Sequence, residues 1–258
     1  MIETLILSIC IGVSVGLSAG YLGSLMVLEK MALVGDALSH VALPGLALGI
    51  VYNFNPFIGA FAFLFVSAVV IWHLGRVTKL SFDTIVGATF TLALAVGILM
   101  LKEVELLGEA LFGDITNVTI IDTGIAVLVS VVALLAANRI YKRLVLSMIS
   151  EELAVSKGIS VSKINLIYLL LVSLVVAAGI KIVGTLLVGF LVIVPAAAAK
   201  NLSSDLFKYA VLSAVFGAVS AIAGVLSSSF LNLPTGPLIV ISGVTIFAVS
   251  VLAKWQSK

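Results

Sequence analysis

The sequence consists largely of apolar runs that are long enough to cross a membrane. A spanning helix needs about 20 mostly apolar residues, and runs of that kind recur from one end of the chain to the other. We predict spans near residues 4–28, 31–52, 57–74, 84–101, 118–138, 163–180, 183–199, 206–230 and 237–253. The two segments around Lys181 lie so close together that they can form one broken or re-entrant unit. The prediction is therefore eight or nine transmembrane helices.

The composition excludes a soluble fold. Hydrophobic residues make up 62% of the 258 residues and charged residues only 10%, whereas a soluble domain carries about 25% charged residues. The sequence therefore predicts an all-α fold, a polytopic membrane helical bundle that forms one transmembrane domain over residues 1–258 and is surrounded by membrane lipid. The net charge of +2 gives no reason to expect nucleic acid as a partner. The single cysteine, Cys10, excludes an intrachain disulfide, and we expect it to be a small buried hydrophobic residue.

Basic residues recur in alternate connections between the spans. They follow the third, fifth and seventh predicted spans and close the chain, whereas the connection after the fourth is acidic from Glu103 to Asp114. Because basic loops collect on the cytoplasmic side, we predict a multi-pass protein of the plasma membrane with its N-terminus outside and its C-terminus in the cytoplasm. The first residues, MIETLILS, lack the basic region of a signal peptide, so we expect the first apolar run to remain as a transmembrane helix.

The stretch GDALSHVALPGLALG places ionisable residues inside the second predicted span. A helix over residues 31–52 is about 33 Å long, and His40 lies about 14 Å from its cytoplasmic end, close to mid-membrane. Asp36 precedes His40 by four residues, so both side chains share one helix face. Ionisable side chains at this depth usually face a cavity and mark the path of an ion or substrate.

Pro44 adds a third feature to this stretch. A proline inside a helix removes the hydrogen bond to the carbonyl four residues back, which here belongs to His40. A carboxylate, an imidazole and a freed carbonyl together favour a divalent metal ion. The residues leave simpler interpretations open: Asp36 can cap a helix that starts beside it, His40 can donate to a neighbouring carbonyl, and Pro44 can be a plain kink. Two side chains also need further ligands from water, other helices or a second subunit.

The segment SEELAVSKGISVS lies in the longest basic connection. Ser150 can cap a short helix whose first turn is acidic, as the helix dipole prefers, and Gly158 can end it. This predicts an amphipathic helix at the cytoplasmic surface, either structural or a docking site for a cytoplasmic partner. A helix-turn-helix is excluded because the second helix would be the apolar run INLIYLLLVSLVVAAG, which lacks the arginines that read bases.

Four segments in sequence order resemble one known family. EKMALVGDALSHVALPGLALG resembles the signature of the permease subunits of metal-uptake ABC transporters, the zinc and manganese (ABC-3) family. SEELAVSKGIS resembles the cytoplasmic loop of that family that contacts the ATPase. VGTLLVGFLVIVPAAAAK and LPTGPLIV resemble its proline-terminated apolar run and the turn before its last helix. The resemblance covers nearly the whole chain.

The resemblance implies a permease, homodimeric or paired, that works with a separate ABC ATPase subunit and an extracytoplasmic metal-binding protein. It implies that Asp36 and His40 are metal ligands in the translocation path, with Pro44 as a kink in that path. The cargo would be a divalent ion, zinc or manganese, with iron as a further candidate, and no cofactor would be bound permanently. The binding protein would meet the acidic segment and the NLPTGP turn. The ATPase would dock on Glu151, Glu152, Leu153, Ala154 and Gly158.

The chain itself is predicted to be a transport subunit and not an enzyme. It holds no G-x-x-x-x-G-K-[ST] phosphate loop, so ATP hydrolysis is expected on the separate subunit. Neither an HExxH string nor a pair of catalytic aspartates supports an intramembrane enzyme. Two alternatives remain: a proton-coupled secondary metal transporter with Asp36 and His40 as a relay, and an ABC permease for a metal chelate or cobalamin. The only other histidine, His73, lies at a span end and is expected to be an interfacial side chain.

Overall fold

The protein, seen here in a computed structural model, is described for residues 2–29, 31–78, 80–100, 118–185 and 188–256. These residues form helices α1 (Ile2–Leu28), α2 (Ala32–Val51), α3 (Pro56–Val77), α4 (Phe82–Met100), α6 (Ile120–Ile149), α7 (Glu151–Ser156), α8 (Val161–Val183), α9 (Val188–Leu202), α10 (Leu206–Leu231) and α11 (Thr235–Gln256). No strand occurs in these ranges, so the predicted all-α bundle is confirmed. The acidic segment from Glu103 to Asp114 lies outside them.

Eight helices of the described ranges are long and apolar enough to cross a membrane: α1, α2, α3, α4, α6, α8, α10 and α11. The remaining apolar helix, α9, has 15 residues and is about 22 Å long, shorter than the hydrocarbon core of about 30 Å. The chain breaks after α8 at Gly184, which has a φ of 80° that favours glycine. The predicted unit around Lys181 is therefore one full-length helix followed by a short one.

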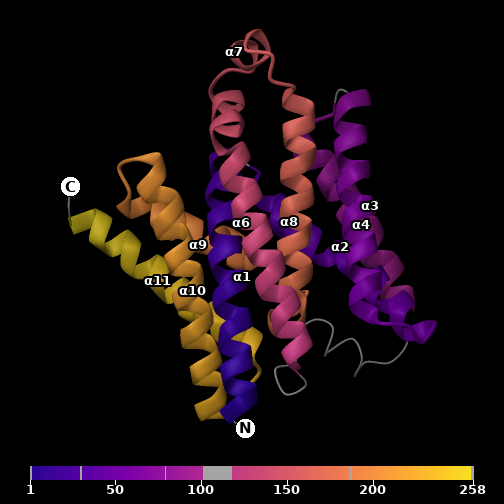
Figure 1. Ribbon diagram of the computed structural model, residues 1–258, viewed down its shortest axis with the longest axis vertical. Coiled ribbons are helices and arrows are strands. Elements are labelled where there is room, and N and C mark those ends of the chain that lie inside the picture. Colours follow the sequence, from indigo (N-terminus) through magenta and orange to yellow (C-terminus); the bar gives the residue numbers. More distant parts are fainter. Residues whose placement is uncertain (1, 30, 79, 101–117, 186–187, 257–258) are drawn as a thin grey trace.

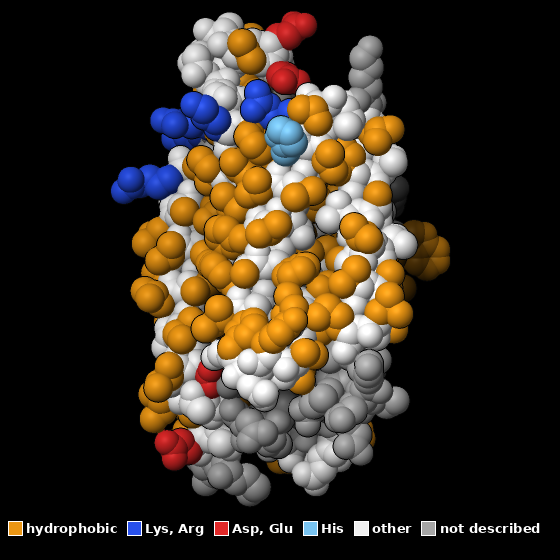
Figure 2. All heavy atoms as spheres, turned by 90° about the vertical axis from the view of Figure 1, so that its right-hand side faces the viewer, with side chains coloured by type: hydrophobic (Ala, Val, Ile, Leu, Met, Phe, Trp, Pro, Cys, Tyr) orange, Lys and Arg blue, Asp and Glu red, His pale blue; other side chains and the backbone are white. Residues whose placement is uncertain are grey.

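The helices run between two ends of the bundle. In Figure 1, α7 caps one end and the N-terminus lies at the opposite end. Figure 2 shows Lys and Arg side chains gathered toward the α7 end, above a broad band of hydrophobic side chains. This distribution is what the positive-inside rule expects if α7 is cytoplasmic. The orientation of the termini stays a prediction.

Helix α6 extends beyond its predicted span of 118–138. Thr119 and Asp122 form a capping box at its start: the Thr119 hydroxyl accepts from the Asp122 N–H at 3.2 Å, and the Asp122 carboxylate accepts from the Thr119 N–H at 3.0 Å. The helix then continues to Ile149, so the basic stretch from Arg139 to Arg143 is helical and the predicted boundary is wrong. Arginine and lysine are good helix formers, so the charges that end the apolar run do not end the helix.

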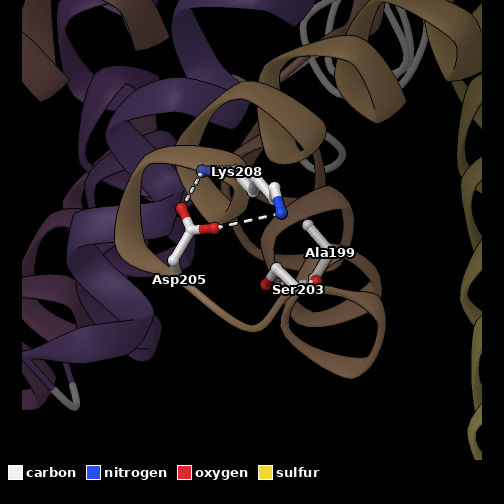
Figure 3. Close-up of polar contacts among 4 residues, drawn as sticks. All are labelled: Ala199, Ser203, Asp205 and Lys208. Atoms are coloured by element: carbon white, nitrogen blue, oxygen red, sulfur yellow. Dashed lines mark hydrogen bonds and ion pairs between the residues drawn. The ribbon is translucent and has the colours of Figure 1, made fainter.

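The turn before α10 shows how a helix start is fixed outside the membrane. The Asp205 carboxylate caps α10 by accepting from the backbone N–H of Lys208 at 2.8 Å, and its second oxygen lies 3.5 Å from the Lys208 ammonium (Figure 3). The backbone hydrogen bond from Lys208 lowers the pKa of Asp205. The Ser203 hydroxyl donates to the Ala199 carbonyl at 2.8 Å at the end of α9. These bonds satisfy groups that helix ends leave without partners.

Helix α2 is the most enclosed spanning helix, with 78% of the segment Val34–Val51 buried. Its backbone comes close to that of α3 at Gly45 and Gly59. A Cβ placed on Gly45 would lie 2.2 Å from the Gly59 carbonyl oxygen, which is closer than real Cβ contacts. Small residues of this kind let transmembrane helices pack backbone to backbone. The stretch that carries Asp36 and His40 therefore lies on a helix that neighbouring helices hold tightly.

Cys10 departs from its predicted burial. It is exposed on α1, whereas its neighbour Ile11 is fully buried. Within an apolar run, hydrophobic periodicity does not separate the core-facing side of a membrane helix from its outer side. The expectation that Cys10 is a buried hydrophobic residue is therefore wrong.

Candidate metal site

Asp36 and His40 lie side by side on α2, as their spacing predicts. The Asp36 Oδ1 is 3.9 Å from the His40 Nε2. Helix α2 begins at Ala32 after Met31, so Asp36 lies in its second turn and does not cap it. The interpretation of Asp36 as a helix cap is therefore wrong, and the carboxylate is available to a ligand.

The two side chains have different surroundings. The His40 side chain is only 11% exposed, whereas the Asp36 side chain is 50% exposed. The ring of Phe90, from α4, lies beside the imidazole with 5.2 Å between centroids. The His40 Nδ1 is buried and has no hydrogen-bond partner in the described residues. His40 thus has one nitrogen directed to the carboxylate and one without a protein partner, which is uncommon for a buried polar atom.

Pro44 is buried within α2, one turn after His40. The helix continues through it, and its missing N–H leaves the His40 carbonyl without that hydrogen bond. Gly97 of α4 packs against this point: a Cβ on Gly97 would lie 3.0 Å from the Leu43 Cβ and 3.3 Å from the Pro44 nitrogen. Helix α4 therefore closes over the proline step as well as over the imidazole. The role of the carbonyl as a ligand stays a prediction.

Gly189 is a site neighbour that the sequence did not reveal. It is the second residue of α9, and a Cβ built on it would lie 2.6 Å from the Asp36 Cα and 3.0 Å from the Asp36 nitrogen. The first turn of α9 therefore rests directly on the backbone of Asp36. The only signal in the sequence was a glycine shortly after the break near Lys181, and glycines are frequent in this chain.

The pair alone does not complete a metal site. No group of three or more His, Cys, Asp or Glu side chains that could hold a metal occurs among the residues that the structure describes. Carboxylate and imidazole together suit Mn²⁺, Fe²⁺ and Zn²⁺. The arrangement offers two side-chain ligands with one largely buried, so further ligands must come from outside this pair.

The predicted docking segment forms a helix with the predicted caps. The Ser150 hydroxyl accepts from the Leu153 N–H at 3.2 Å, and Gly158, with a φ of 73°, follows the end of α7. The Ile159 N–H donates to the Ala154 carbonyl at 3.0 Å and closes the last turn.

The exposure of the docking residues divides them into two groups. Glu151, Glu152, Leu153 and Gly158 are exposed, whereas Ala154 is fully buried and faces the bundle. Val155 is 59% exposed and was not among the predicted residues. Helix α7 thus offers an outer surface that is acidic at its start and apolar at Leu153 and Val155.

The fold and site define a class before any comparison. A bundle of apolar helices that holds an ionisable pair within a spanning helix is a polytopic membrane protein with a polar site inside the membrane. A family model described as the ABC 3 transport family matches residues 1–254. The chain belongs to this family, and the predicted family and its general role as a membrane permease of an ABC transport system are confirmed.

The chain is similar to proteins with manganese and zinc in their names. It is 33% identical over 243 residues, 93% of this chain and 87% of the relative, to the manganese transport system membrane protein MntC of Listeria monocytogenes. It is 32% identical to the high-affinity zinc uptake system membrane protein ZnuB of Buchnera aphidicola, over 94% of this chain and 95% of the relative. The solved structure of PsaBC from Streptococcus pneumoniae in complex with Fab matches with a TM-score of 0.83 and 31% identity, over 94% of this chain and 89% of that chain.

Proposed function

We propose that this chain is the membrane permease subunit of an ABC importer for divalent metal ions, manganese or zinc, with iron as a further candidate. The observation that carries the proposal is the Asp36–His40 pair, with 3.9 Å between the Oδ1 and Nε2 atoms on the most enclosed spanning helix. Manganese and zinc relatives of similar identity support this cargo class and do not choose between the two ions.

The site binds its cargo weakly enough to release it. Two side chains fill only part of the coordination shell of Mn²⁺ or Zn²⁺, and an ion held too well cannot leave a conduction path. A homodimer with two-fold symmetry brings the same patch of both subunits together. If α2 lies near that axis, two carboxylates and two imidazoles meet, and the freed His40 carbonyls can add to them. We therefore propose a homodimer whose shared site is built from both copies of Asp36 and His40.

The energy for transport enters at the α7 end. The sequence holds no phosphate loop, so a separate ATPase binds and hydrolyses ATP. The exposed part of the docking surface consists of Glu151, Glu152, Leu153 and Gly158, and buried Ala154 anchors it to the bundle. In this proposal an extracytoplasmic binding protein delivers the ion at the opposite end, the N-terminus lies outside, and the C-terminus lies in the cytoplasm. ATP binding then switches the single transmembrane domain between outward and inward access.

The test is metal uptake by the complex that copurifies with a tagged copy of this chain, reconstituted in proteoliposomes. The double variant D36A/H40A should lose ATP-dependent uptake of Mn²⁺ and Zn²⁺ while it still assembles with its partners and keeps basal ATP hydrolysis. His73→Ala is the matched control, because His73 is exposed at the end of α3, away from the pair. Wild-type uptake by the double variant would exclude the proposed site.

A further inference from the structure

A tryptophan near the end of α3 ties this helix to the start of α8. The Trp72 Nε1 donates to the Ser162 carbonyl at 2.7 Å and lies 3.0 Å from the Ser162 hydroxyl oxygen. The guanidinium carbon of Arg76 lies 5.1 Å from the centre of the Trp72 ring, a cation–π distance that holds the ring in this orientation. The indole is thus fixed on both sides at the end of the bundle that carries α7.

Ser162 follows the docking helix closely in the chain. Helix α7 ends at Ser156, and its last turn is closed by the Ile159 N–H, which donates to the Ala154 carbonyl at 3.0 Å. Ser160 then accepts, through its carbonyl, from the Ile164 N–H at 3.1 Å as α8 begins. Only Ser160 and Val161 lie between this closed turn and Ser162, so a displacement of α7 carries Ser162 with it.

The other end of α3 touches the helix that holds the metal pair. The Gly45 and Gly59 backbones meet so closely that a Cβ on either glycine would lie within 2.2 Å of the carbonyl oxygen of the other. Packed backbones at this separation do not interpenetrate, so α3 cannot move toward α2 without displacing it. Gly45 directly follows Pro44, so the contact lies about one turn from His40.

We propose that Trp72 is a positioning residue that transmits motion of the ATPase-docking helix through α3 to α2. The inference rests on the proposed function, since it assigns the route by which ATP hydrolysis reaches the metal pair. The route runs from α7 to Ser162, from Ser162 to Trp72, along α3, and through Gly59 and Gly45 to the proline step of α2. Apolar packing between α3 and α8 can slide, whereas a directed hydrogen bond fixes their relative position.

The test uses the reconstituted complex and measures metal moved per ATP hydrolysed. Trp72→Phe keeps an aromatic ring and removes the N–H donor. We expect the ratio to fall about five-fold, the change that corresponds to loss of one hydrogen bond of about 1 kcal/mol, with ATPase copurification unchanged. Ser162→Ala removes the hydroxyl and keeps the carbonyl, so its ratio should lie between those of Trp72→Phe and wild type. Trp255→Phe, at an exposed tryptophan on α11, is the control and should keep the wild-type ratio.

A second readout separates this proposal from the proposed function. Hydrogen exchange of the complex is compared before and after the ATPase is trapped with ATP and vanadate. In the wild-type complex the exchange of α7 and α3 should change together, and in Trp72→Phe the change should be confined to α7 and α8. This readout needs no metal cargo, so it tests the link between Trp72 and Ser162 even if the wild-type complex transports no metal. The proposal is overturned if both Trp72→Phe and Ser162→Ala keep the wild-type ratio of metal moved to ATP hydrolysed. It is likewise overturned if both variants keep the wild-type pattern of hydrogen exchange.

Discussion

The contact between Gly189 and Asp36 leads to a strong prediction about transport. In Gly189→Ala the added Cβ would lie 2.6 Å from the Asp36 Cα, whereas carbon atoms prefer about 3.5–4.0 Å. Helix α9 or α2 must therefore shift by about 1 Å at the residue that we propose as a metal ligand. Overpacking of this kind costs about 1–3 kcal/mol, which corresponds to about a 5- to 150-fold effect if it falls on the metal-competent state.

The assay for this prediction is initial uptake of Mn²⁺ in proteoliposomes, with the amount of assembled complex measured in parallel. Gly124→Ala is the matched control, because no atom lies within 4 Å of a Cβ at that position on α6. Alanine in a helix interior is favoured over glycine by about 1 kcal/mol, so this control should be at least as stable as wild type. Uptake by Gly189→Ala equal to that of Gly124→Ala would refute the claim that α9 positions Asp36.

Two further predictions concern the α7 end of the protein. Burial raises the pKa of Glu29, whose Oε2 has no hydrogen-bond partner in the described residues. The contribution of this carboxyl to folding stability is complete below the ordinary pKa of glutamate and is lost as the pH rises through the raised pKa of the folded state. Glu29→Gln should therefore raise the unfolding temperature at pH 7.5, with little effect at about pH 4. The control Glu3→Gln, at an exposed position, should leave the unfolding temperature unchanged at both pH values. Thermal unfolding curves of Glu29→Gln and wild type that coincide at pH 7.5 would contradict the prediction. Ser150→Ala removes the α7 cap, which costs about 1 kcal/mol, and should lower the amount of ATPase that copurifies with the chain. Ser147→Ala is the control for this variant. If Ser150→Ala copurifies as much ATPase as wild type, a docking role for α7 is refuted.

The residues show which parts of the fold and site were readable from sequence. Asp36 and His40 were paired correctly because helical spacing is local and fixes their shared face. The ends of α7 were predicted because Ser150 and Gly158 act through backbone geometry near each residue. Span positions followed from apolar length alone.

The remaining features depend on contacts between distant segments. The contact of Gly189 with Asp36 joins residues far apart in the chain, and no local pattern reports it. The exposure of Cys10 depends on which side of α1 packs against other helices, and the sequence of an apolar run does not indicate which side that is. The Trp72–Ser162 bonds likewise form only when α3 and α8 pack together. The segments that resemble the family include Asp36 and Gly189, and only the packed structure shows that these two residues meet.

The most direct test of the central claim is electron spin resonance of Mn²⁺ bound to the purified permease complex. If His40 ligates the transported ion, the nitrogen hyperfine coupling of an imidazole should appear in the wild-type complex, disappear in His40→Ala and remain in His73→Ala. Absence of nitrogen coupling in the wild-type complex, or its persistence in His40→Ala, would contradict the proposal that Asp36 and His40 form the metal site.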